Sequence, residues 1–92
     1  MAGLADDSVR QILFANLIVT WWNSSYVSKD MTGSQLSLLL HTFFSGEVGR
    51  EYWSMAAQGW RDVAQLSKVK RQQRFVAIVD AGYQAALAAN SS

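Results

Sequence analysis

Three side chains of this sequence could transfer protons: His41, Asp80 and Tyr83. His41 is the only histidine, and an imidazole titrates near neutral pH, which suits a general acid or base. Ser37 and Ser45 stand one helical turn to either side and could supply a nucleophilic hydroxyl. A serine nucleophile also needs an oriented base and an oxyanion hole, and no motif here indicates them. We therefore favour a solvated histidine on a serine-rich helix face.

Asp80 lies within VAIVDAGY, where nearly every neighbour is apolar. A carboxylate at the edge of an apolar stripe either pairs with a cation or has a shifted pKa. The first hypothesis is a structural ion pair with Arg50, Arg61 or Arg74, which we favour. The second is a catalytic or ligand-anchoring acid in an aromatic pocket.

Four cations fall within KVKRQQR, from Lys68 to Arg74, where a helix is expected to begin. Positive charge there opposes the helix dipole, so a partner should offset it. Asp62 and Glu51 are the expected partners, and a contact to phosphate or nucleic acid is the alternative. The net charge of the chain is only +1 and no recognition-helix pattern is present, so we do not expect nucleic-acid binding.

The aromatic residues are the most unusual feature, with four Trp, three Tyr and four Phe in 92 residues. Trp21 and Trp22 are adjacent, as are Tyr52 and Trp53, and adjacent side chains on a helix point about 100 degrees apart. The four rings cannot all enter one core, so some must line a pocket, a partner surface or solvent. The residues that we expect to bind a ligand or partner are Asn16, Trp21, Trp22, Arg50, Tyr52, Trp53 and Trp60.

Helices must position these residues, because proline is absent and apolar residues recur at spacings of three and four. We predict an all-α fold, a compact bundle of about four helices in a single domain, residues 1–92. The expected helices cover residues 7–23, 32–46, 47–66 and 70–89, with an exit loop at 24–30 and a flexible tail at 90–92. The expected caps are Asp6, Asp7 and Ser8, the Thr32–Gln35 capping box, and Gly46.

Each expected helix carries an apolar stripe, which predicts its buried face. The stripes are Leu36, Leu39, Leu40 and Phe43 in the second helix, Val48, Tyr52, Met55, Trp60 and Val63 in the third, and Phe75, Val79, Tyr83 and Leu87 in the fourth.

The first helix contains LFANLIVTWW, in which eight of ten residues are apolar. Only Asn16 and Thr20 interrupt the run, and both fall in one narrow stripe. Because Trp21 and Trp22 diverge, we expect this helix to have two buried faces. It would then be either the central helix of the bundle or part of a dimer interface.

Composition limits the classes of function. Half of the residues are hydrophobic and 16% are charged, which predicts a packed domain with apolar surface left for a partner. With no cysteine and one histidine, we expect no metal and no cofactor. The start MAGLADDSVR lacks the basic character of a secretory signal, and the apolar run is too short to cross a bilayer. We therefore expect a soluble, cytoplasmic protein with no membrane contact.

Four segments together resemble a family of small actinobacterial domains of unknown function. They are ANLIVTWW, GEVGREYW, the pair Gly59 and Trp60, and RQQRFVAIVDAGY, and the resemblance covers roughly residues 10–85. It implies an all-helical domain in a bacterial cytoplasm, and it implies no mechanism.

Two functions fit these observations. The leading hypothesis is a helical binding module that self-associates, or binds a protein partner, through an aromatic surface of the first and third helices, with Asn16, Thr20 and Arg50 orienting the contact. The alternative is a small cofactor-independent enzyme or a binder of an apolar small molecule, with Asp80, His41 and Tyr83 as acids or bases.

Overall fold

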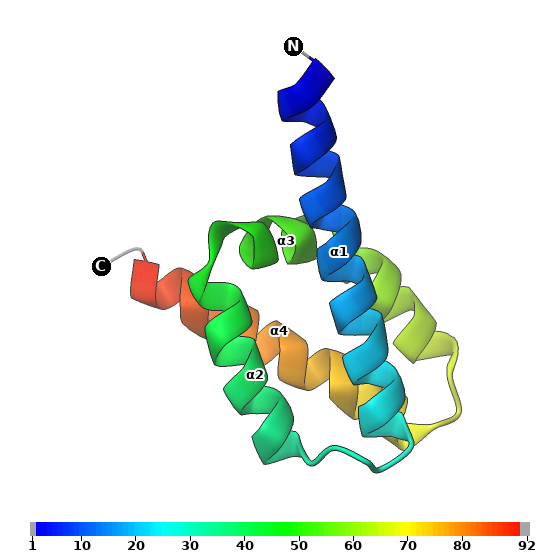
Figure 1. The fold of residues 1–92 in the computed structure, drawn as a ribbon. Coiled ribbons are helices and arrows are strands. Elements are labelled where there is room, and N and C mark those ends of the chain that lie inside the picture. The colour runs from blue at the N-terminus through cyan, green and yellow to red at the C-terminus, as the bar shows by residue number, and fades with distance from the viewer. Residues whose placement is uncertain (1, 91–92) are drawn as a thin grey trace.

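The structure is a computed structural model that describes the backbone of residues 2–90 and the side chains of residues 7–90. Four helices follow one another: α1 (Ala2–Val27), α2 (Gly33–Ser45), α3 (Glu47–Leu66) and α4 (Lys70–Asn90) (Figure 1). The all-α prediction is confirmed, and the described residues contain no strand. Among those residues, no helix combines the length and the apolar character needed to cross a bilayer.

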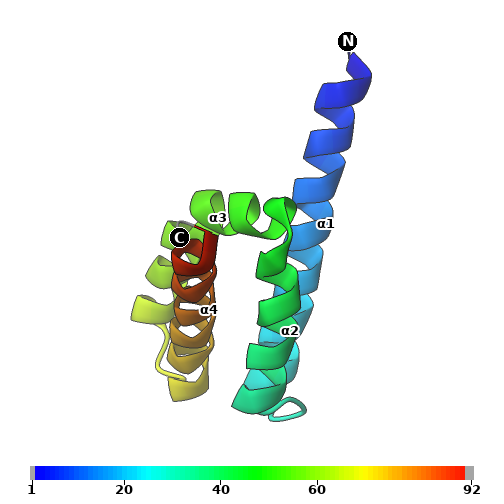
Figure 2. The same ribbon diagram turned by 90° about the vertical axis from the view of Figure 1, so that its left-hand side faces the viewer.

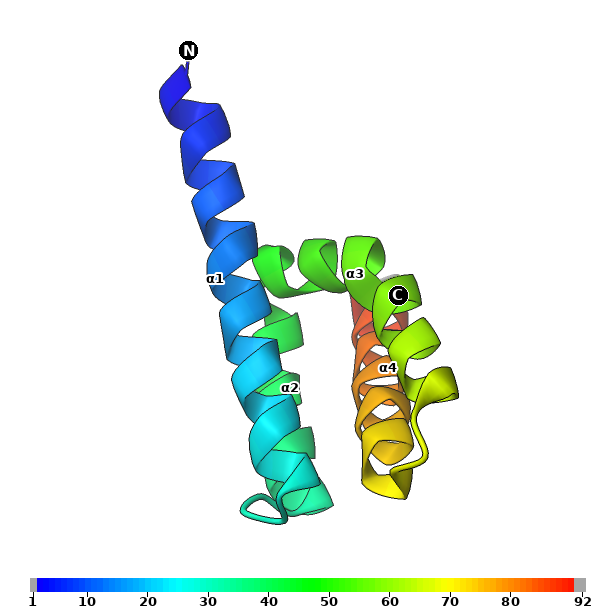
Figure 3. The same cartoon turned by 90° about the vertical axis from the view of Figure 1, so that its right-hand side faces the viewer.

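The helices form two layers joined by α3. Figure 2 and Figure 3 show α1 and α2 in one layer and α4 in the other, with α3 crossing between the layers, and Figure 1 shows that α1 and α2 stand apart within their layer. The first half of α1 projects beyond the other helices, which accounts for a molecular length of 44 Å against widths of 30 and 22 Å (Figure 1). Consequently α1 lies at one side of the bundle, with only one face turned to the other helices.

Local signals that the sequence displays set the start of α2 and the turn between α2 and α3. The capping box is confirmed, because the Gln35 backbone N–H donates to Thr32 Oγ1 at 3.1 Å and the Thr32 N–H donates to Gln35 Oε1 at 2.9 Å. Gly46 ends α2 as predicted and also caps the start of α3, with an extended backbone at φ −92°. Arg50 closes the turn, since its Nη1 donates to the carbonyls of Phe44 and Ser45 at 2.8 and 3.0 Å.

The first helix is longer than predicted at both ends. It includes Asp6, Asp7 and Ser8, which were expected to cap it, and it continues through the expected loop to Val27. No proline or glycine interrupts residues 4–32, and Tyr26, which is 4% exposed, anchors the last turn in the core. At the other end of the chain, residue 90 still belongs to α4, and residues 91 and 92 of the expected tail lie outside the described residues.

The core lies where the two layers meet. Its largest fully buried side chains are Val19, Leu36, Leu40, Phe44, Trp53, Phe75 and Val79. Four residues of the predicted stripes are instead more than a third exposed. They are Leu39, Met55, Val63 and Leu87.

Candidate functional site

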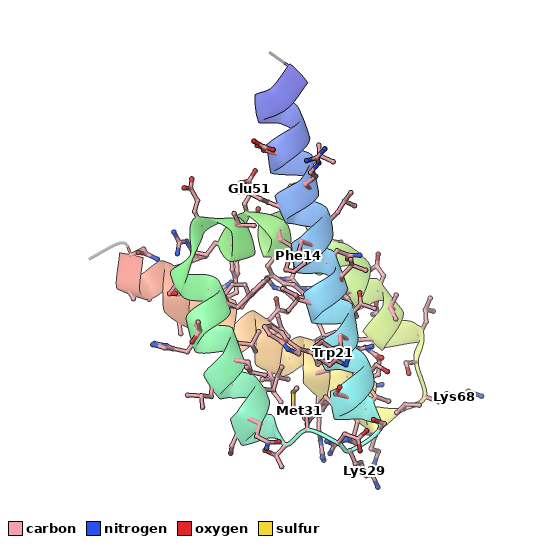
Figure 4. All side chains as sticks on the ribbon, in the orientation of Figure 1. Phe14, Trp21, Lys29, Met31, Glu51 and Lys68 are labelled. Carbon is pink, nitrogen blue, oxygen red and sulfur yellow. The ribbon has the colours of Figure 1, made fainter. Side chains whose placement is uncertain are left out.

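The outward side of α1 carries large apolar side chains that are more than half exposed among the described residues. Val9, Leu13, Phe14, Leu17 and Trp21 are between 56% and 71% exposed, and we call these five residues the α1 outer face. Phe14 and Trp21 lie two helical turns apart on it (Figure 4). Since monomeric proteins rarely expose a contiguous apolar patch of this kind, the α1 outer face is the candidate functional site.

The α1 outer face continues onto α3. Met55 and Val63 on α3 are 67% and 55% exposed. A hollow of about 260 Å³ between the two helices is lined by Val9, Leu13 and Met55, among others. On the other side of α1, a groove of about 460 Å³ runs beside Phe14 and is lined mainly by apolar atoms. The exposed ridge is therefore flanked by a depression on each side.

The adjacent tryptophans Trp21 and Trp22 point to different sides of α1, as their positions on a helix predict. Trp21 is 71% exposed, whereas Trp22 is half-buried and meets the ring of Phe43 edge-on at 5.4 Å between centroids. Trp22 therefore helps to hold α1 against α2, and Trp21 remains available to a partner.

Tyr52 and Trp53 also separate, but both are buried, at 3% and 0% exposure. Tyr52 faces α1, where its hydroxyl donates to Asn16 Oδ1 at 2.6 Å and accepts from Trp60 Nε1 at 2.9 Å. Burial raises the pKa of Tyr52, and the hydrogen bond from Trp60 offsets only part of that rise. The chain Asn16–Tyr52–Trp60 therefore joins α1 to α3 within the protein.

Trp53 faces the other layer and meets Asp80 on α4. Its indole N–H donates to Asp80 Oδ1 at 2.8 Å, and Arg61 donates two hydrogen bonds of 2.9 and 3.0 Å to the same carboxylate. Burial by itself raises the pKa of Asp80, but hydrogen bonds from Arg61 and Trp53, together with the Arg61 charge, outweigh it and lower the pKa. Of the two hypotheses for Asp80, the geometry matches the ion pair, and its partner is Arg61.

The three acid–base candidates lie apart. His41 and Ser37 line a groove of about 430 Å³ between α2 and α4, whereas Asp80 faces α3. Tyr83 is half-buried and meets Phe44 edge-on at 5.6 Å. No hydrogen bond in the described residues joins any two of His41, Asp80 and Tyr83, and residues 7–90 contain no cluster of three or more His, Asp or Glu able to hold a metal.

The basic segment Lys68 to Arg74, which runs into the first turn of α4, contacts backbone carbonyls that the sequence did not indicate. Arg71 donates to the carbonyls of Tyr26 and Met31 at 2.7 and 3.1 Å, and its guanidinium stacks on the Tyr26 ring at 4.0 Å. Lys68 extends into solvent (Figure 4). Asp62, one of the expected partners, instead accepts a hydrogen bond from Gln58. Carbonyls at the end of α1 and in the loop that follows it therefore offset part of this charge.

Four residues of the α1 outer face were absent from the expected binding set: Val9, Leu13, Phe14 and Leu17. All were visible as apolar residues on one side of the first helix, but the sequence does not show which side of that helix the other three helices cover. Conversely, Arg50 and Trp53 were expected at a binding site, and the structure places them in a helix cap and in the core.

A model of a family of unknown function, DUF6082, matches residues 2–92. No curated protein and no solved structure matches the chain. The chain therefore belongs to the family DUF6082, whose function is unknown.

Proposed function

We propose that the protein is a small interaction module that self-associates through the α1 outer face. The observation that carries the proposal is that five large apolar side chains on one face of a single helix are more than half exposed, although the domain has a complete core of its own. Covering Phe14, Leu17 and Trp21 would remove apolar surface from water, which favours association by about 25 cal/mol per Å² before the entropic costs of binding.

Trp21 and Phe14 are the expected anchors of the contact. Aromatic side chains contribute a large contact area and lose few rotamers on binding, so they dominate many interfaces. Met55 and Val63 would extend the contact onto α3. Thr20 borders the ridge and remains able to orient a partner, whereas Arg50 is engaged by the α2 carbonyls.

Residue-resolved NMR on dilution tests this proposal. Amide signals of residues 9–24, and those near Met55 and Val63, should shift between concentrated and dilute samples, because these residues leave the contact. Signals around Leu38, which is 73% exposed but lies on α2, provide the internal control and should stay constant. Spectra that do not change with concentration anywhere would refute the proposal.

A second candidate is the groove between α2 and α4, which supports the alternative of a small apolar ligand. Its volume of about 430 Å³ suits such a molecule, its floor is formed by Phe44 and Gly82, and His41 stands at its edge as a polar group. Titration with apolar ligands should then shift the His41 ring signals saturably. A His41→Ala variant that binds as tightly as the wild type would remove His41 from this role.

A further inference from the structure

Five exposed residues of α1 repeat at the spacing of a coiled-coil seam. Arg10, Phe14, Leu17, Trp21 and Ser24 are separated by four, three, four and three residues, and every one of them is exposed. A mean spacing of 3.5 residues keeps such positions facing one partner helix along its length. We call these five residues the α1 seam.

The α1 seam lies opposite the side of α1 that packs on the bundle. Ala15 and Val19, at 3% and 0% exposure, fall on the inward side of the helical wheel, about half a turn from Leu17 and Trp21. Consequently α2, α3 and α4 leave room for a helix on the outside. The first half of α1 also projects past the bundle, so a partner helix can follow it over its whole length (Figure 1).

The order of side chains along the seam favours an antiparallel arrangement of two copies. Around a two-fold axis between Phe14 and Leu17, Phe14 of one copy meets Leu17 of the other. One layer outward, Arg10 of one copy lies against Trp21 of the other and forms a cation–π pair. In this layer a flexible side chain also packs against an aromatic ring, so two bulky rings do not meet. The next layer places Asp7 opposite Ser24.

A parallel arrangement would oppose identical residues. Arg10 would face Arg10 and Asp7 would face Asp7, which places like charges together at one end of the pair. Trp21 would face Trp21, so the two largest side chains of the seam would crowd into one layer. The charges and sizes along the seam therefore select the antiparallel direction.

We infer that the partner of the α1 outer face is a second copy of this chain, bound as an antiparallel α1–α1 pair along the α1 seam. This inference rests on the proposed function and adds the partner's direction and register. The exposed parts of Leu13, Phe14, Leu17 and Trp21 from two copies give on the order of 1,000 Å² of buried surface. That area is enough for a specific but weak and concentration-dependent dimer.

Cysteine cross-linking tests the register, because the chain has no cysteine of its own. Ser24 is the last residue of the α1 seam, and Asp7 lies one helical turn before its first residue. Both are exposed and polar, so replacing them removes no apolar contact area. They are separated by about 25 Å along one helix, which prevents a disulfide within one chain. In the antiparallel pair, however, residue 7 of each copy lies beside residue 24 of the other.

Mild oxidation of an equimolar mixture of Asp7→Cys and Ser24→Cys proteins should yield mainly the mixed disulfide dimer, and each variant alone should stay largely uncrosslinked. Ser34→Cys, at an exposed site on α2, measures the level of random collision. Efficient cross-linking of Ser24→Cys alone would establish a parallel pair and overturn the inference while leaving self-association intact. A dimeric mass with no more cross-linking than Ser34→Cys shows would overturn the pairing along the α1 seam but leave self-association intact. A monomeric mass throughout would overturn both the seam and the proposed function.

Discussion

The indole N–H of Trp53 donates to the carboxylate of Asp80 at 2.8 Å, and this hydrogen bond joins α3 to α4 beside the core. Trp53 is completely buried, so its N–H cannot turn to water if the carboxylate is removed. Arg61 binds both carboxylate oxygens in a bidentate pair, with Nη2 donating to the same Oδ1 and Nε donating to Oδ2. Asp80 therefore serves the fold of this protein through two different donors.

Replacing Asp80 should destabilise the domain in proportion to the interactions lost. Asp80→Ala leaves the buried Trp53 N–H without an acceptor and should lower the free energy of unfolding by about 2 kcal/mol. Asp80→Asn keeps an oxygen for Trp53 but loses the charge that binds Arg61, and the pair is partly exposed, so its cost should be about 1 kcal/mol. Urea unfolding followed by circular dichroism measures both. Asp62→Ala, at an exposed site, should stay close to the wild type, and an equal loss there would contradict this account.

Acid should remove the same stabilisation. The folded protein lowers the pKa of Asp80, so the carboxylate stabilises the fold at pH values above its unfolded pKa, near 4, and this contribution disappears as the pH falls through the lower folded pKa. The difference in unfolding free energy between wild type and Asp80→Asn should therefore shrink in acid. Urea unfolding of both proteins at neutral and acidic pH tests this, and a difference that is constant with pH would argue against a charged Asp80.

Two glycines of α3 should respond oppositely to alanine. A Cβ at Gly49 would overlap the carbonyl oxygen of Phe43, in the tight turn between α2 and α3, so Gly49→Ala should cost about 2 kcal/mol. A Cβ at Gly59 would meet nothing within 4 Å, so Gly59→Ala should stabilise the helix by about 0.5–1 kcal/mol. Thermal unfolding of the two variants provides a matched comparison. A stabilised Gly49→Ala would show that the turn has more room than the structure indicates.

Helix signals in the sequence predicted much of the fold. Thr32, Gln35 and Gly46 mark the ends of α2 through local hydrogen bonds and backbone preferences, which do not depend on distant residues. The ends of α1 were harder to predict, because residues 4–6 and 24–27 contain no glycine or proline and the burial of Tyr26 extends the helix.

The packing between helices could not be predicted from one sequence. The first helix was expected to have two buried faces, but within this chain the helix between two layers is α3, with Tyr52 turned to α1 and Trp53 to α4. The contact of Asp80 with Arg61 spans 19 residues and depends on how α3 and α4 meet. Which aromatic residue remains exposed therefore follows from the arrangement of helices, and local periodicity does not determine it.

A charge placed in the α1 outer face should abolish association without unfolding the domain. Leu17 is 66% exposed, so Leu17→Glu buries no charge in the monomer but would do so in the contact. We expect the dissociation constant for self-association of Leu17→Glu to be at least tenfold higher than that of the wild type, as measured by sedimentation velocity. Its circular dichroism spectrum should be unchanged. Leu38→Glu is the matched control, since Leu38 on α2 is 73% exposed. This variant should associate as the wild type does.

The solution mass of the wild-type protein tests the central claim most directly. Light scattering across a wide range of protein concentration should show the mass rising from 10.2 kDa towards twice that value as the α1 outer faces of two copies pair. A mass that stays at 10.2 kDa at every concentration would contradict self-association.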